Sequence, residues 1–177
     1  MTADADPRDR FERIWDDCYE HVLAYLARRA PGDAGDLAAE TFAVAWRRIG
    51  DVPREPLPWL YGVARRVLAN RRRGDRRAGA LVARLGGERP GSAPDPADLV
   101  GSDEALRAGF AALSDADREI LALVAWEGLR PGEAAAVLGI PAPLASARLH
   151  RARARLRRAL AAADAPPTPT TTPGEQR

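Results

Sequence analysis

The sequence predicts an all-α protein built from two small helical domains that are joined by a flexible linker. Apolar residues make up 46% of the 177 residues, and most are Ala, Leu or Val, a set that favours helix over strand. They recur at intervals of three and four along several segments, as on the buried face of a helix. A stretch rich in Gly and Pro separates two groups of such segments. We therefore expect a first domain at residues 7–77, a linker at 78–102, a second domain at 103–163 and a disordered tail at 164–177.

Three helices are expected in the first domain. Asp6 is placed to cap a helix at 7–29, which a Pro-Gly dipeptide then stops. Asp33 is placed to cap a second helix, which runs to residue 49. A loop punctuated by prolines leads into a third helix at 59–73.

Four helices are expected in the second domain, at 103–113, 115–126, 131–138 and 144–162, with Ser114 as the cap of the second. The last two helices and the turn between them have the layout of a helix-turn-helix. In that motif the N-terminal turns of the second helix enter the major groove of DNA. A helical hairpin with a solvated basic flank is the alternative interpretation.

Basic charge is concentrated in two of these helices. Residues 58–77 hold seven arginines and one acid, and residues 144–158 hold six arginines and no acid, although the net charge of the chain is only +2. In the first segment the arginines lie on one arc and a core face on the other, the latter made of Leu60, Val63, Ala64, Val67 and Leu68. Like charges one turn apart repel each other, and an anionic partner would relieve that repulsion. A solvated cationic face beside a core is the other interpretation.

The second helix of the first domain carries a different pattern. Its expected core stripe consists of Ala38, Phe42, Ala45, Trp46 and Ile49. Leu37 and Val44 are expected to point away from that stripe, near acidic residues. Two exposed apolar side chains among acids are typical of a protein-binding face, although single surface apolar residues are also common.

Features of other protein classes are missing from the sequence. A single cysteine, Cys18, cannot form an intramolecular disulfide, and the polar N-terminus does not resemble a signal peptide. No uncharged stretch has the length of a membrane span. We therefore expect a soluble cytoplasmic protein without membrane insertion.

Six segments of the chain form a recognisable set. In the first domain they are YLARR, AGDLAAETFAVAW and PWLYGVARRVLANRRR, at residues 25–29, 34–46 and 58–73. In the second they are LSDADREILAL, AAAVLGIP and SARLHRARARLRRAL, at residues 113–123, 134–141 and 146–160. Together they resemble bacterial RNA polymerase sigma factors of the extracytoplasmic-function (ECF) group, and the resemblance covers residues 11–160 in the order that the family has.

The resemblance implies three binding surfaces. Core RNA polymerase would bind Asp33, Asp36, Leu37, Glu40 and Val44. The non-template strand of the minus-ten promoter element would bind Trp59, Tyr61, Arg65, Arg66, Asn70 and Arg73. The minus-thirty-five element would be read by Arg148 and Arg151, with Ser146, His150, Arg153 and Arg155 beside them. An anti-sigma protein is a further partner that the resemblance suggests, but no residue identifies it.

Two other functions fit the sequence less well. A stand-alone helix-turn-helix regulator would need a dimerisation or sensor domain, which the sequence does not show. A metal-dependent hydrolase would need more than Cys18 and His21, since two ligands do not make a zinc site. The sequence thus predicts a sigma factor with no catalytic residues, no metal and no cofactor.

Overall fold

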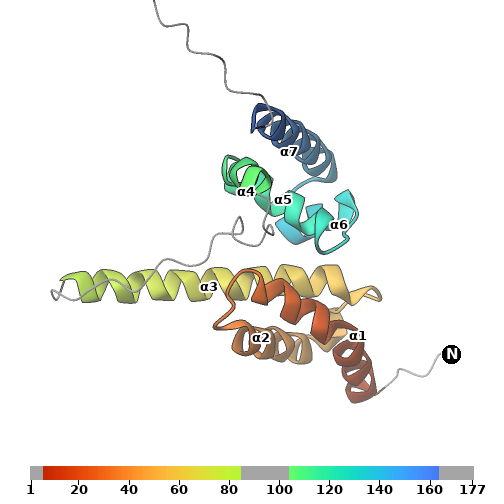
Figure 1. Ribbon diagram of the computed structural model, residues 1–177. Helices are drawn as coiled ribbons and strands as arrows, with labels where there is room; N and C mark the ends of the chain where they lie inside the picture. Colours follow the sequence, from red (N-terminus) through yellow and green to blue (C-terminus); the bar gives the residue numbers. More distant parts are fainter. Residues whose placement is uncertain (1–5, 85–103, 164–177) are drawn as a thin grey trace, which may run out of the picture.

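The computed structural model describes residues 6–84 and 104–163, which form α-helices, one 3-10 turn and no strand (Figure 1). The predicted all-α class is confirmed. The expected tail at 164–177 and the expected linker from residue 85 to residue 102 lie outside the described residues.

The first unit is a three-helix arrangement. Its helices are α1 (Pro7–Ala27), α2 (Ala34–Arg47) and α3 (Pro56–Arg84), with η1 (Ile49–Asp51) between the last two. As predicted, Asp6 caps α1, because its carboxylate accepts a hydrogen bond from the Arg8 backbone N–H at 3.0 Å. Asp33 precedes α2 but makes no such bond, so its predicted capping role is wrong.

Helix α3 is longer than the sequence predicts. It continues to Arg84 instead of ending at residue 73, so residues 78–84 are helical and do not belong to the expected linker. The expected helix ended before Gly74, and the expected linker contained Gly79, but a glycine inside a helix costs only about 1 kcal/mol relative to alanine. Good helix formers surround both glycines, and they are enough to keep the helix intact.

The second unit holds α4 (Glu104–Ala111), α5 (Asp115–Ala125), α6 (Pro131–Leu138) and α7 (Ala142–Ala163). The Ser114 hydroxyl accepts a hydrogen bond from the Asp117 backbone N–H at 3.3 Å, which confirms the predicted cap of α5. Gly139 ends α6 in the left-handed region with φ of +66°, where glycine is free of steric cost. The turn that follows sends the chain into α7.

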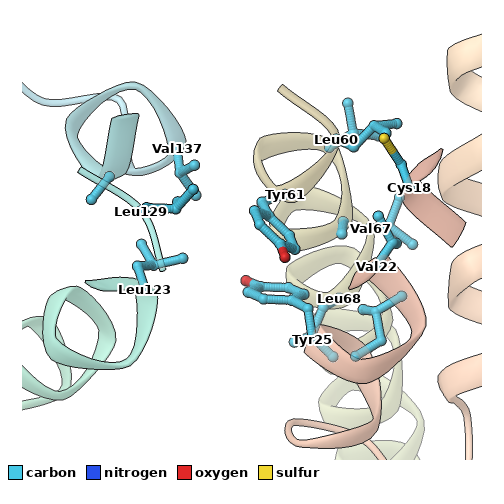
Figure 2. Packing of buried hydrophobic residues seen from close by; sticks show 14 of the residues in the cluster. Cys18, Val22, Tyr25, Leu60, Tyr61, Val67, Leu68, Leu123, Leu129 and Val137 are labelled. Carbon is cyan, nitrogen blue, oxygen red and sulfur yellow. The ribbon is translucent and has the colours of Figure 1, made fainter. Parts of the chain in front are cut away.

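The two units contact each other, which the sequence did not predict. Helix α3 lies along α6, and their buried residues belong to one hydrophobic cluster (Figure 1). A Cβ atom added at Gly62 of α3 would lie 3.9 Å from the Cα atom of Val137 in α6. Figure 2 shows Tyr25 and Tyr61 on the side of the first unit that faces Leu129 and Val137.

Candidate functional site

Helix α3 presents an arginine surface to solvent. Its core side is buried as predicted, at Leu60, Val63, Ala64, Val67 and Leu68. On the opposite side, Arg65, Arg66, Asn70 and Arg73 are all exposed. Among the described residues, no acid forms an ion pair with Arg65 or Arg66. These two guanidinium groups are therefore free to meet an anion.

Other arginines of α3 are used within the protein. Arg71 forms ion pairs with Asp33 at 3.0 Å and with Asp75 at 3.8 Å. The guanidinium of Arg72 donates a hydrogen bond to the backbone carbonyl of Arg29 at 3.0 Å. These contacts fasten α3 to the N-terminal end of α2 and the C-terminal end of α1.

The aromatic side chains predicted to meet the minus-ten strand differ in exposure. Trp59 is half-buried, and the Arg48 guanidinium lies 6.0 Å from its ring centroid. Tyr61 is only 1% exposed, so in this arrangement it does not lie at the surface with the other residues predicted to contact the minus-ten strand. The reason is that Tyr61 lies on the face of α3 that packs against α6, with its ring 5.1 Å from that of Tyr25.

Helix α7 presents the second arginine surface. Its buried side consists of Ala145, Leu149 and Ala152. The predicted residues Ser146, His150, Arg151, Arg153 and Arg155 are exposed, and Arg148 is half-buried. Arg155 also donates a hydrogen bond to the buried carboxylate of Asp117 in α5. Arg155 therefore holds α7 on α5 as well as facing solvent.

The predicted protein-binding face of α2 is corrected by the structure. Asp36 and Glu40 are exposed and Val44 is half-buried, as a binding face requires. Leu37, however, is only 1% exposed. Because α2 packs against both α1 and α3, its buried stripe is wide enough to include Leu37.

A surface aromatic cluster lies where α1 and α2 meet. Trp46, expected in the core, is 47% exposed, and Trp15 of α1 is 38% exposed. The Trp46 ring lies 5.2 Å from that of Phe11, and the Trp15 ring lies 4.8 Å from that of Phe42. The hollow between the helices is lined by Arg8, Phe11, Glu12, Trp15, Asp16 and Trp46. Large exposed aromatic rings in a hollow are typical anchors of protein interfaces.

Within residues 6–84 and 104–163 there is no group of three side chains that could hold a metal ion, and no helix with the length and apolarity of a membrane span. Cys18 is buried, and burial together with the nearby charge of Asp17 raises the pKa of its thiol to about 11. A thiol in that state is a packing group rather than a nucleophile.

Two family models match the chain. Residues 15–78 match sigma-70 region 2, and residues 103–156 match sigma-70 region 4. The first match contains α2 and the arginine surface of α3. The second contains α4 to α6 and the exposed part of α7 up to residue 156.

A curated relative of the chain is a probable sigma factor. The chain is 30% identical over 161 residues to the probable RNA polymerase sigma factor RfaY of Xanthomonas campestris pv. campestris; the match covers 85% of this chain but only 40% of that protein. Among solved structures, CnrH in complex with the cytosolic domain of CnrY is 27% identical, with a TM-score of 0.57, and 88% of this chain and 89% of that chain are covered.

A second solved structure agrees in fold. It is the sigma factor RpoE in complex with the anti-sigma factor NepR, from Bartonella quintana. It is 23% identical to this chain with a TM-score of 0.61, and the match covers 88% of this chain and 98% of that one.

Proposed function

Because the chain belongs to the sigma-70 family of RNA polymerase sigma factors, in its ECF group, we propose that it binds core RNA polymerase and directs promoter recognition and DNA opening. One observation carries this proposal. Exposed arginine surfaces lie on two separate helices, α3 and α7, and a third surface on α1 and α2 is aromatic and acidic. The positive charge of the α3 and α7 surfaces is suited to binding DNA, and the aromatic and acidic surface on α1 and α2 is suited to binding a protein.

The surface of α3 would take the minus-ten element. Arg65, Arg66 and Arg73 supply positive charge for the phosphates of a separated strand, and Asn70 supplies hydrogen bonds. The half-buried ring of Trp59 at the N-terminal end of α3 gives an unpaired base a surface on which to stack. Strand capture of this kind makes duplex opening favourable.

The surface of α7 would take the minus-thirty-five element. Arg148 and Arg151 lie within the first three turns of α7, the part of a recognition helix that reaches base edges. Ser146, His150, Arg153 and Arg155 would contact phosphates beside them. Since Arg155 already forms an ion pair with Asp117, it would hold α7 in position on α5 as well as contribute positive charge to the DNA-binding surface.

Core polymerase would bind the α1–α2 surface. Asp36 and Glu40 provide acidic contacts beside the half-buried Val44, and the exposed rings of Trp46 and Trp15 provide apolar area. Buried aromatic side chains carry much of the binding energy in protein interfaces. In this proposal the exposed Trp46 replaces the buried Leu37 as an apolar contact to polymerase, while Asp33 is held by Arg71.

The chain would act as a binding subunit and not as an enzyme, with no cofactor. An anti-sigma protein is a further proposed partner, since the CnrH and RpoE structures are complexes with CnrY and with the anti-sigma factor NepR. A stand-alone helix-turn-helix regulator would use α7 alone. It would leave the α3 and α1–α2 surfaces without a purpose.

Co-elution of the purified chain with core polymerase tests the proposal. We expect a stable complex, and we expect that complex, but neither component alone, to make thymines near the minus-ten element reactive to permanganate. A chain that binds duplex DNA sequence-specifically without polymerase and never co-elutes with it would contradict the proposal and favour the stand-alone regulator.

A further inference from the structure

A buried cluster of charges joins the two units of the chain. The carboxylate of Glu127, in the segment between α5 and α6, accepts a hydrogen bond from Arg29 at 3.2 Å and another from Arg28. Arg29 also lies 3.6 Å from the carboxylate of Glu119 in α5. The side chains of Arg29 and Glu127 are only 4% and 2% exposed. The arginines follow α1 and the acids belong to the other unit, so every one of these contacts crosses the junction.

Two tyrosines complete the junction on the side of the first unit. The Tyr25 hydroxyl lies 3.4 Å from the Glu119 carboxylate, to which it donates a hydrogen bond, and the Arg29 guanidinium lies 3.8 Å from the Tyr25 ring centroid. The Tyr61 ring lies beside that of Tyr25, and both face the second unit (Figure 2). Burial raises the pKa of both phenols above their usual range, so both hydroxyls stay protonated.

The contacts at this junction are specific, but they can be broken. Charges taken out of water must be compensated by complete hydrogen bonding, and here the bonding is incomplete. The Nε atom of Arg28 and the Nη2 atom of Arg29 are buried and have no hydrogen-bond partner among the described residues, and the Nε atom of Arg29 is too far from Glu119 for a hydrogen bond. Once the units separate, water can solvate all four charged side chains. A contact of this composition can open without loss of the apolar packing within each unit.

We propose that Arg28, Arg29, Glu119 and Glu127 form an interdomain latch, which holds the chain closed with Tyr61 covered and which must open before promoter DNA is captured. The proposal rests on the proposed sigma-factor function. In the closed chain α6 lies on the face of α3 that holds Tyr61 and Gly62, close along the chain to Trp59 (Figure 2). Opening would expose Tyr61 next to Trp59, and two neighbouring rings give unpaired bases a larger stacking surface.

The first test weakens the latch in the full-length chain. Glu127→Gln keeps the shape of the side chain but removes its charge, so Arg28 and Arg29 stay buried without a full counter-charge. Losing one partner of a buried ion pair shifts such an equilibrium by about 100-fold or more. Glu104→Gln is the matched control, because among the described residues Glu104 pairs with Arg107, on the exposed surface of α4.

Fluorescent labels report the distance between the units. They are attached to cysteines introduced at the exposed positions Glu20 and Ala112, in a Cys18→Ala background. We expect energy transfer to fall in Glu127→Gln and to stay unchanged in Glu104→Gln. Once bound to polymerase, the Glu127→Gln chain should have the same affinity for a forked minus-ten probe as the unaltered chain. Starting from the free chain, Glu127→Gln should bind core polymerase and probe together at least about fivefold more tightly than the unaltered chain, because a larger fraction of it is already open.

The second test holds the latch shut. Gly62→Cys with Val137→Cys places two cysteines across the junction, where the backbones are close enough for a disulfide. We expect the oxidised chain to lose capture of the forked probe, and reduction to restore it. Oxidised chain that captures the probe as well as reduced chain would overturn the proposal, as would unchanged energy transfer in folded Glu127→Gln protein.

These experiments distinguish a failure of the latch from a failure of the proposed function. If the unaltered chain binds neither polymerase nor promoter DNA, the proposed function is wrong, whereas the energy-transfer measurement still decides whether Glu127 holds the units together. If Glu127→Gln does not fold, Arg28→Gln replaces it, since Arg28 is the more exposed of the two arginines and Glu127 keeps its bond to Arg29.

Discussion

Removing the two free arginines of α3 should weaken capture of the minus-ten strand by an amount that depends on salt. In Arg65→Ala with Arg66→Ala, two exposed cations are lost that have no ion-pair partner among the described residues. The free energy of unfolding should therefore change little. The change should appear in DNA binding alone.

The size of the effect follows from counterion release. Each phosphate contact to a single strand adds about 0.7 to the slope of log affinity against log salt concentration, so losing two contacts should lower the slope by about 1.4. If the two proteins bind equally at about 1 M salt, the variant should bind about 25-fold more weakly at about 0.1 M. Fluorescence anisotropy of a labelled single-stranded minus-ten oligonucleotide with reconstituted holoenzyme measures both quantities.

Arg71→Ala is the matched control for this experiment. It removes the same charge from the same helix, but Arg71 is already paired with Asp33 and Asp75. Its loss should change the slope much less than the loss of Arg65 or Arg66 does. An unchanged slope in the double variant, or an equal change in Arg71→Ala, would refute the assignment of the α3 surface to DNA.

Three further predictions concern the first unit. Leu37→Ala should lower the free energy of unfolding by about 2–5 kcal/mol in thermal or denaturant unfolding, because it leaves a cavity beneath α2. A loss of polymerase affinity without loss of stability would instead indicate that Leu37 is a surface residue that contacts polymerase. Trp46→Ala should instead reduce core-polymerase affinity by about 30-fold or more, as an interface anchor does, and should leave the melting temperature nearly unchanged; normal affinity would remove Trp46 from the interface. Iodoacetamide should alkylate Cys18 far more slowly in the folded chain than in denaturant at pH 8, because a pKa of about 11 keeps the thiol protonated there; equal rates would contradict its burial.

Local signals in the sequence predicted much of the fold. The caps at Asp6 and Ser114 and the core arc of α3 depend only on neighbouring residues, and each was confirmed. The end of α3 was not predicted, because glycine weakens a helix without always ending it. Whether a helix passes through a glycine depends on the helix-forming strength of the residues on both sides.

The errors at the candidate site share one physical cause. A helical wheel gives the angle of each side chain but not the width of the arc that other helices cover. Leu37 was expected at the surface, but it is buried because α2 contacts two helices, while Trp46 at the other end of α2 reaches solvent. Tyr61 is covered by α6, which is distant in the sequence. No local sequence pattern predicts such a contact.

Run-off transcription tests the central claim most directly. Core polymerase would be given a candidate promoter template with and without this protein. We predict transcripts of one defined length only when the protein is present, and their loss in Arg65→Ala with Arg66→Ala. Transcription that is the same with and without the protein, on templates that the protein nonetheless binds, would contradict the account.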